Sequence, residues 1–202
     1  PVVESVGIDE AYVDLTGIGE PVGGALRAGE ALRRRVHAEL DVAVSVCIAG
    51  SRTTAKVGSD RAKPDGIIDV PVGQDAAFLA PFAIRELPMV GPKAAEALGR
   101  MGVRTIGQLA RLDERWLVQQ FGSAGPVLAA RARGEDPTPV NGNGRVARSI
   151  SREVTFLEDV TDAAELRRVL ALHAERVGAD LRESGRRART VTLKLRWDDF
   201  TT

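Results

Sequence analysis

The sequence predicts an α+β protein built from three consecutive pieces. Residues 1–72 alternate short β-rich runs with two helical stretches, whereas residues 73–138 show only short helical stretches separated by Gly and Pro. A linker at 139–148 follows, and residues 149–202 place one long helical stretch between two apolar runs. We therefore expect a sheet with helices, a compact helical subdomain, and a second small unit of strands and helix.

Composition limits the classes of protein that this chain can belong to. Its 202 residues carry 28 basic and 28 acidic side chains, so a uniformly basic nucleic-acid wrapper is excluded and binding must come from local patches. Hydrophobic residues make up 44%, which excludes disorder over most of the length, and aromatics only 4%, which predicts an aliphatic core. The single cysteine, Cys47, lies in an apolar run and is predicted to be a buried, inert thiol.

No stretch approaches the roughly 20 apolar residues that a membrane helix needs. We therefore expect no membrane association and a cytoplasmic location. The chain starts at Pro1 without a methionine and stops at Thr202 directly after a strand-like run. We expect both ends to be cut from something longer.

Periodicity predicts the elements of the first and last pieces. The first piece is predicted to hold a hairpin of Val2–Ile8 and Ala11–Leu15, a helix over 25–40, a buried strand Val42–Ala49 and a helix over 51–62. The last piece is predicted to hold strands Ser149–Leu157 and Thr190–Trp197 around a helix Asp162–Glu183, capped by Asp159 or Thr161. Two strands and one helix bury too little to be stable alone, so this piece must pair with something else.

Two adjacent carboxylates, Asp9 and Glu10, interrupt the predicted hairpin. At a turn or bulge both can reach one ion, and Mg²⁺ prefers oxygen ligands together with substrate phosphates. The pair is therefore a candidate metal and catalytic site for phosphoryl transfer. On composition alone, a solvated turn is the favoured interpretation.

A lysine stands at the end of the second predicted helix. Lys63 lies in the segment RAKPDG (61–66), where its charge suits a triphosphate. An ordinary helix C-terminus, which favours cations through the helix dipole, is the alternative.

A glycine turn precedes a small-residue helix in the segment LPMVGPKAAEAL (87–98). Such a helix N-terminus presents free backbone N–H groups to a phosphate, and glycine lets the phosphate approach. Val90, Gly91 and Lys93 are therefore predicted to contact a DNA backbone, against the alternative of a plain helical hairpin.

Basic side chains gather around the last piece. Arg145, Arg148 and Arg152 precede or open its first predicted strand, and a second group follows its helix at 186–196. Surfaces that track phosphates have this composition, although a solvated face in an arginine-rich protein is an equal alternative.

Taken in order, three motifs resemble the Y-family translesion DNA polymerases, most closely the bacterial DNA polymerase IV (DinB) type. They are GIDEAYVDLTG (7–17), SVCIA (45–49) leading to AKVGSDRAKPDG (55–66), and the glycine turn at 87–98. Gly7 stands where the family usually has Ser, a change that leaves both carboxylates in place.

The resemblance implies a domain for each piece and a role for each candidate residue. It makes residues 1–72 the C-terminal part of the palm, 73–138 the helix-hairpin-helix thumb, 139–148 the linker, and 149–202 the N-terminal part of the little finger. Asp9 and Glu10 would be metal ligands and Lys63 the triphosphate contact. Residues from Arg145 onward, including Ser149, resemble the segment that opens the little finger.

The resemblance also implies cofactors and partners. These are two Mg²⁺ ions, primer-template DNA and deoxynucleoside triphosphates, in a monomer that meets a sliding clamp through residues absent from this chain. The family's first metal-binding Asp, its steric gate and its fingers would precede Pro1, so we expect this chain alone to be an inactive fragment.

Two classes of function remain open. The first is part of an error-prone translesion polymerase that transfers nucleotides with two metal ions. The second is a non-catalytic DNA-binding paralogue or accessory module. The retained Asp9-Glu10 pair favours the first, because a module without catalysis has no need for adjacent carboxylates at a phosphate site.

Overall fold

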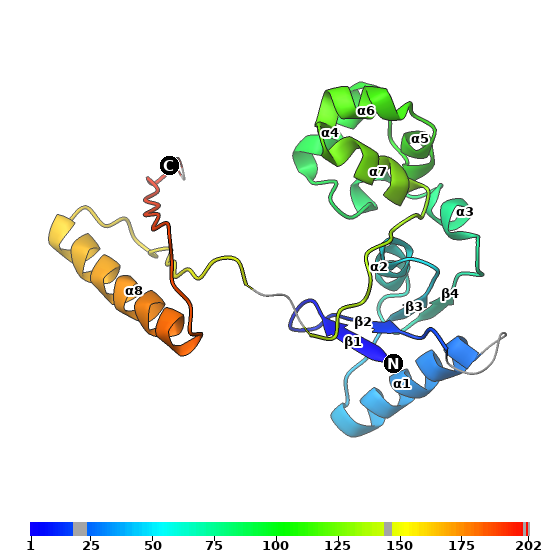
Figure 1. Ribbon diagram of the computed structural model, residues 1–202, viewed down its shortest axis with the longest axis horizontal. Helices are drawn as coiled ribbons and strands as arrows, with labels where there is room; N and C mark the ends of the chain where they lie inside the picture. Colours follow the sequence, from blue (N-terminus) through cyan, green and yellow to red (C-terminus); the bar gives the residue numbers. More distant parts are fainter. Residues whose placement is uncertain (18–23, 144–146, 200, 202) are drawn as a thin grey trace. The chain divides into compact units, whose positions relative to one another are not determined.

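The computed structural model describes residues 1–17, 24–143, 147–199 and 201. The chain divides into two compact units, residues 1–144 and 145–202 (Figure 1). The mixed α and β character expected from the sequence is confirmed. In chain order the elements are β1 (Val2–Ser5), β2 (Ala11–Asp14), α1 (Gly24–Leu40), β3 (Val46–Ile48), α2 (Arg52–Arg61), β4 (Ile67–Asp69), α3 (Asp75–Leu79), η1 (Ile84–Glu86), α4 (Pro92–Arg100), α5 (Ile106–Ala110), α6 (Glu114–Phe121), α7 (Ala124–Ala132) and α8 (Ala163–Glu183).

The predicted hairpin forms from β1 and β2. The two strands pair antiparallel, with Val2 opposite Asp14 and Ser5 opposite Ala11. Both strands are shorter than predicted, because the chain leaves the ladder before Val6 and rejoins it after Glu10. The hairpin therefore presents a loop of five residues that contains both candidate carboxylates.

A second small sheet lies between α1 and α2 (Figure 1). Strand β3 pairs in parallel with β4, a strand that the sequence did not predict. Successive side chains of a strand face opposite sides. Val46 and Ile48 accordingly meet α1 at Gly29, while Cys47 meets α2 at Gly58. A Cβ atom at Gly58 would collide with the Sγ atom of Cys47, and one at Gly29 would lie 2.9 Å from Cδ1 of Ile67 in β4, so both helices pack tightly on the sheet.

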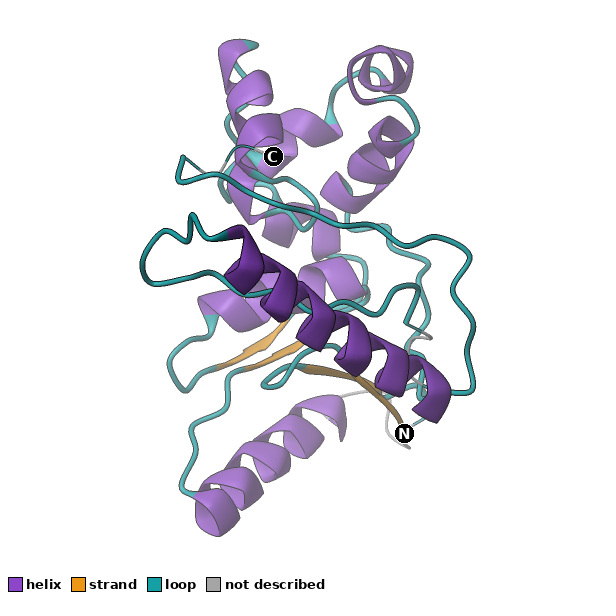
Figure 2. Cartoon of the chain, turned by 90° about the vertical axis from the view of Figure 1, so that its left-hand side faces the viewer, coloured by secondary structure: helices purple, strands orange, loops and turns teal. Residues whose placement is uncertain are grey.

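Residues 75–132 form short helices, η1 and α3 to α7, as the Gly and Pro spacing predicted. Figure 2 shows how short the strands are beside the helices of this chain. A backbone bridge joins Ala83 to Thr105 and fixes the start of α5. The core is aliphatic, as expected, and its fully buried large members are Leu79, Leu87, Leu98, Ile106, Leu109 and Leu117.

The second unit consists of α8 and extended segments on either side of it. The helix is predicted correctly, but its cap is Asp162, which accepts from the backbone N–H of Ala164 at 2.8 Å, and not Asp159 or Thr161. No residue of α8 is fully buried. The helix therefore buries little of its surface within its own unit.

The two strands predicted beside this helix are wrong. Within the described residues of this unit, 147–199 and 201, neither Ser149–Leu157 nor Thr190–Trp197 is a strand. Both segments have the right side-chain alternation, but a strand also needs a neighbour for its backbone groups. Leu193, at 66% exposed, and Trp197, at 69%, show how little covers the second segment.

Candidate active site

The loop between β1 and β2 positions the two candidate carboxylates. The backbone carbonyl of Glu10 accepts hydrogen bonds from the N–H groups of Val6 at 3.0 Å and Gly7 at 3.3 Å. These bonds close the loop, which leaves Asp9 and Glu10 adjacent and exposed. The turn on which the metal hypothesis depends is therefore present.

Helix α2 brings a cation to this loop. The Nζ atom of Lys56 lies 2.5 Å from Oε1 of Glu10. It also lies 3.2 Å from Oδ2 of Asp60, one turn further along α2. Partial burial opposes the charge of Lys56, but its bonds to both carboxylates raise its pKa.

The predicted triphosphate contact stands at the end of the same helix. The Nζ atom of Lys63 lies 2.8 Å from Oδ1 of Asp60, and the lysine side chain is 63% exposed. Partial burial raises the pKa of Asp60, but hydrogen bonds from Lys63 and Lys56 outweigh it and lower that pKa. Glu10 and Lys63, which are 53 positions apart in the sequence, are thus joined by one row of charges of alternating sign.

The turn after Lys63 is fixed by its own contacts. The N–H of Gly66 donates to the carbonyl of Ala62 at 2.6 Å, an approach that a side chain at position 66 would block. Arg33 of α1 bonds the Asp65 carboxylate at 2.8 Å and also its carbonyl. Lys63 therefore projects from a turn whose conformation is fixed by these contacts.

The glycine turn lies at the start of α4. Gly91 caps the helix, and Gly91 and Lys93 are both exposed. Pro92 has no N–H, so the first turn offers the N–H groups of Gly91, Lys93 and the residue that follows. Val90 differs from its neighbours, because its side chain is only 6% exposed and its N–H is bonded to the carbonyl of Leu87. Only the carbonyl of Val90 is left for a ligand.

Three of the remaining candidates lie in the second unit. Arg148 and Ser149 are exposed, while Arg152 forms an ion pair with Asp180 of α8. Arg145 lies outside the described residues. These residues belong to a different unit from the charge row that joins Glu10 to Lys63.

Sequence reasoning missed Lys56 and Asp60. Their spacing carried a usable signal, because Lys56, Asp60 and Lys63 are separated by four and three positions, which puts them on one face of a helix. Their link to Glu10 had no such signal, since it depends on how α2 packs beside the hairpin.

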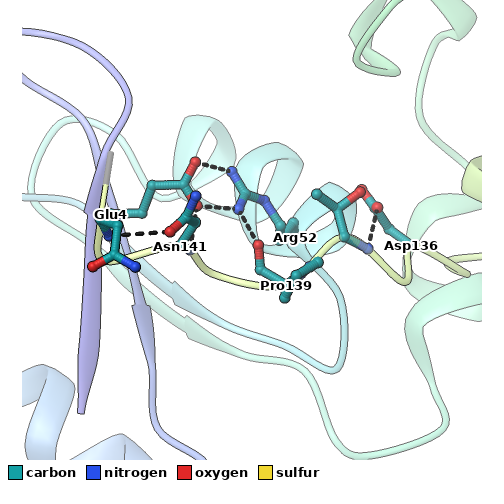
Figure 3. A network of polar contacts seen from close by, with 7 residues as sticks. Glu4, Arg52, Asp136, Pro139 and Asn141 are labelled. Atoms are coloured by element: carbon teal, nitrogen blue, oxygen red, sulfur yellow. Dashed lines mark hydrogen bonds and ion pairs between the residues drawn. The ribbon is translucent and has the colours of Figure 1, made fainter. Parts of the chain in front are cut away.

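A buried polar network beside this site was also missed (Figure 3). Arg52 of α2 binds both carboxylate oxygens of Glu4, at 2.5 and 3.2 Å, and lies 4.1 Å from the ring centre of Tyr12. The same guanidinium donates to the carbonyl of Pro139 at 2.9 Å, and Glu4 accepts from the N–H of Asn141 at 2.7 Å. The segment predicted as a free linker is therefore bonded to β1 and α2.

Family comparisons agree with the motifs. Residues 1–60 match the model of the impB/mucB/samB family, and residues 147–202 match the model of the C-terminal domain of that family. The two matches together cover more than half of the chain. The chain belongs to the impB/mucB/samB family. This confirms its recognition as a Y-family chain of the DNA polymerase IV type.

Curated relatives of this family member are named DNA polymerase IV. The chain is 39% identical over 202 residues to the protein of Dehalococcoides mccartyi strain CBDB1, covering 100% of this chain and 52% of the relative. It is 39% identical over 201 residues to that of Methanoculleus marisnigri, covering 99% and 55%, and 38% identical over 210 positions to that of Streptomyces coelicolor, covering 100% and 43%. The chain thus spans about half the length of these relatives.

Solved structures show the same fold. A Y-family DNA polymerase chimera of Dbh and Dpo4 matches with a TM-score of 0.75 at 21% identity, covering 88% of this chain and 52% of that one. The DinB structure from Sulfolobus solfataricus matches with a TM-score of 0.62 at 24% identity, covering 70% and 42%. Among the described residues, no helix has the length and apolar character needed to cross a membrane.

Proposed function

We propose that this chain is part of an error-prone translesion DNA polymerase of the DNA polymerase IV type. The observation that carries this proposal is the row of charges from Glu10 to Lys63, which lies beside Asp9. Template-directed nucleotidyl transfer requires carboxylates that hold divalent cations close to a cation that binds the triphosphate. Residues from the loop between β1 and β2, from α2 and from the turn after α2 supply both kinds of group in one place.

The elements support an assignment of subdomains. Residues 1–72, with both small sheets and α1 and α2, form the C-terminal part of the palm. Residues 73–138 form the thumb, in which α4 and α5 are the helix-hairpin-helix. Residues 139–148 are the linker, and residues 149–202 are the N-terminal part of the little finger.

Asp9 and Glu10 fit Mg²⁺ by the chemistry of their donors, because both present exposed carboxylate oxygens on one loop. They supply part of a complete set, since the part of the chain that the structure describes contains no group of three ligating side chains. Two bound Mg²⁺ ions would neutralise charge on the reacting phosphates. Lys63 would bind the triphosphate of the incoming deoxynucleotide and orient it.

Primer-template DNA is the proposed macromolecular ligand. Backbone N–H groups at Gly91 and Lys93 would hold a phosphate, while Arg148, Ser149 and Arg152 would bind the backbone from the second unit. Arg145, which lies outside the described residues, is proposed for the same role. None of these groups distinguishes one base from another, so DNA binding would be independent of the DNA sequence and sensitive to salt.

Other partners follow from the same proposal. We propose that a sliding clamp binds residues outside this sequence and that the polymerase is a monomer. A DNA polymerase works where the DNA is, which makes the cytoplasm its proposed location.

The test is an Asp9→Ala substitution in the full-length protein. Primer extension should fall to background, because a ligand of the proposed metal site is lost. Affinity for primer-template DNA should stay within about twofold, because Asp9 is not a phosphate contact. Glu39→Ala, which removes an exposed carboxylate from α1, is the matched control and should leave both unchanged.

Two outcomes would overturn the proposal. One is primer extension by Asp9→Ala at the rate of the parent. The other is a parent protein that binds primer-template DNA and extends no primer, which would instead establish the non-catalytic DNA-binding module.

A further inference from the structure

The row of charges beside the proposed active site connects two groups that bind different ligands. Each end is a functional group in the proposed polymerase, Glu10 for a metal ion and Lys63 for a triphosphate. Each end is also held by an opposite charge on α2, Glu10 by Lys56 and Lys63 by Asp60. A ligand at either end would compete with that contact.

Lys56 is well placed to hold Glu10. Its side chain is 29% exposed, against 44% for Glu10, so Lys56 is partly buried while Glu10 stays open to a ligand from the solvent. The helix that carries Lys56 is fixed by buried residues on its other face, among them Val57 and Thr54. The base of the lysine side chain therefore has a definite position while its Nζ atom reaches two carboxylates.

A divalent cation at Glu10 competes with Lys56 for the same carboxylate, whose Oε1 atom is the one that Lys56 contacts. Two positive charges repel each other at this distance, so Lys56 must withdraw from Glu10 as the cation binds. It has somewhere to go, because Oδ2 of Asp60 is already 3.2 Å from its Nζ atom. Asp60 then pairs more closely with Lys56, and its ion pair with Lys63 weakens.

We propose that Lys56 and Asp60 are positioning residues that couple metal binding at Glu10 to triphosphate binding at Lys63. This inference rests on the proposed function. The metal ion displaces Lys56 from Glu10 toward Asp60, and Lys63, which Asp60 then holds less tightly, becomes available to the triphosphate. Coupling of this kind is reciprocal, so a triphosphate on Lys63 leaves Asp60 free to attract Lys56 and thereby favours the metal.

Metal affinity without nucleotide is the first test, measured by titrating the full-length protein with Mn²⁺ and following free Mn²⁺ by electron paramagnetic resonance. Glu10→Gln must weaken Mn²⁺ binding, which establishes that Glu10 holds the ion. Lys56→Met should then tighten Mn²⁺ binding roughly two- to fivefold, because the competing cation is gone. Lys56→Arg, which keeps the charge, should restore the affinity of the parent.

Asp60 gives the sharper result, because the inference and general electrostatics predict different behaviour. Asp60→Asn should weaken Mn²⁺ binding in the parent, since Lys56 loses its alternative partner and stays on Glu10. In the Lys56→Met background the same change should have no effect. An equal effect in both backgrounds would mean that Asp60 acts on the ion through space, and the coupling would be refuted.

The second test concerns the triphosphate end. At saturating Mg²⁺, Lys56→Met should raise the KM for the incoming nucleotide with kcat unchanged, because Asp60 then binds Lys63 alone. Asp60→Asn should not raise the KM. The control variants are Arg35→Met and Glu39→Gln, which break an exposed pair on α1 at the same spacing and should change neither measurement.

Failure of the proposed metal site and failure of the coupling would give different results. If Glu10→Gln leaves Mn²⁺ binding unchanged, the proposed metal site is wrong. If Glu10→Gln weakens binding while Lys56→Met and Asp60→Asn do not alter it, the site stands and the coupling is wrong. If the KM is the same in the parent and both variants, the link to Lys63 is wrong.

Discussion

Gly91 and Gly107 show how differently two glycines of one subdomain respond to an added side chain. A Cβ atom at Gly91 would meet nothing within 4 Å, whereas one at Gly107 would lie 2.8 Å from the Cβ of Ala80. Gly91 has a φ of −75°, which any residue adopts. The fold itself therefore does not require glycine at position 91. A phosphate that binds at the start of α4 would require it, because a side chain there would block its approach.

We therefore predict that Gly91→Val weakens DNA binding with little loss of stability, and by more than Lys93→Met does. A side chain there would keep the phosphate away from the exposed N–H groups. Gly107→Ala should instead lower the free energy of unfolding, by about 1–3 kcal/mol for overpacking. Urea unfolding measures the stability of both variants, and a salt titration measures their affinity for duplex DNA. Equal affinity of Gly91→Val and its parent would contradict the proposed phosphate contact at the start of α4.

Cys47 should be unreactive in the folded chain. Burial, with the charges of Asp69 and Asp75, raises the pKa of its thiol to about 12. At about pH 8 the folded protein should react with a thiol reagent far more slowly than the same protein in concentrated guanidinium. Rates within a factor of about two of each other would show that Cys47 is accessible.

The same thiol gives a stability prediction. An ordinary thiol loses its proton near 9.0, so the folded chain binds more protons than the unfolded chain between there and about 12. Stability should therefore fall as the pH rises through that interval. Cys47→Ala should remove this part of the alkaline loss, as urea unfolding at several pH values would show.

At the scale of elements, the ion pair of Glu4 and Arg52 holds the segment 134–143 against β1 and α2 through hydrogen bonds to Pro139 and Asn141. Glu4 is 3% exposed, and its contacts to Arg52 and Asn141 join β1, α2 and that segment. Arg52→Met would leave a buried carboxylate without its cation, at a cost of about 3–5 kcal/mol. We predict a lower midpoint in urea and faster proteolysis at 134–143, whereas Glu39→Gln on the surface of α1 should change neither. Unaltered proteolysis would mean that the segment is held by other contacts.

Acid should loosen the same segment. Partial burial raises the pKa of Asp136, but bonds from Thr138 and Thr53 and the nearby Arg131 outweigh it and lower that pKa below the ordinary 3.8. The unfolded chain then binds the proton first, so this stabilisation is complete above about pH 4 and is lost as the pH falls further. Asp136→Asn should abolish the difference in proteolysis at 134–143 between neutral and acid conditions. A segment that opens equally in both proteins would contradict this.

The elements that the sequence predicted well are those whose signal is local. The helix over 25–40 and the one over 51–62 appear almost as predicted, since each carries its own periodicity and, for the second, its own cap at Ser51. β4 was missed because three residues are too few for any period. Ser149–Leu157 and Thr190–Trp197 were overpredicted because alternation shows only which face is apolar, and not whether a partner strand exists.

The candidate site divides in the same way. Asp9, Glu10 and Lys63 stand out as residue types in motifs, so sequence alone selects them. Lys56 and Asp60 connect them only after α2 has packed beside the hairpin, a tertiary event that no local pattern records. Arg52 is hidden for the same reason, because its partners lie 48 and 87 positions away.

At the scale of the whole molecule, the number of metal ligands limits what these 202 residues can do. Asp9 and Glu10 are adjacent and exposed, and within the described residues no third ligating side chain completes a cluster with them. A Mg²⁺ ion held by two carboxylates keeps most of its water and is bound loosely, and two such ions would not be aligned with the reacting oxygens. We therefore predict that a mass-verified sample of this sequence binds primer-template DNA weakly and extends no primer with Mg²⁺ and all four deoxynucleotides. The full-length protein, assayed in parallel, should extend the same primer. Extension above background by the 202-residue chain would show that Asp9 and Glu10 suffice, and the ligand count argued from this structure would be wrong.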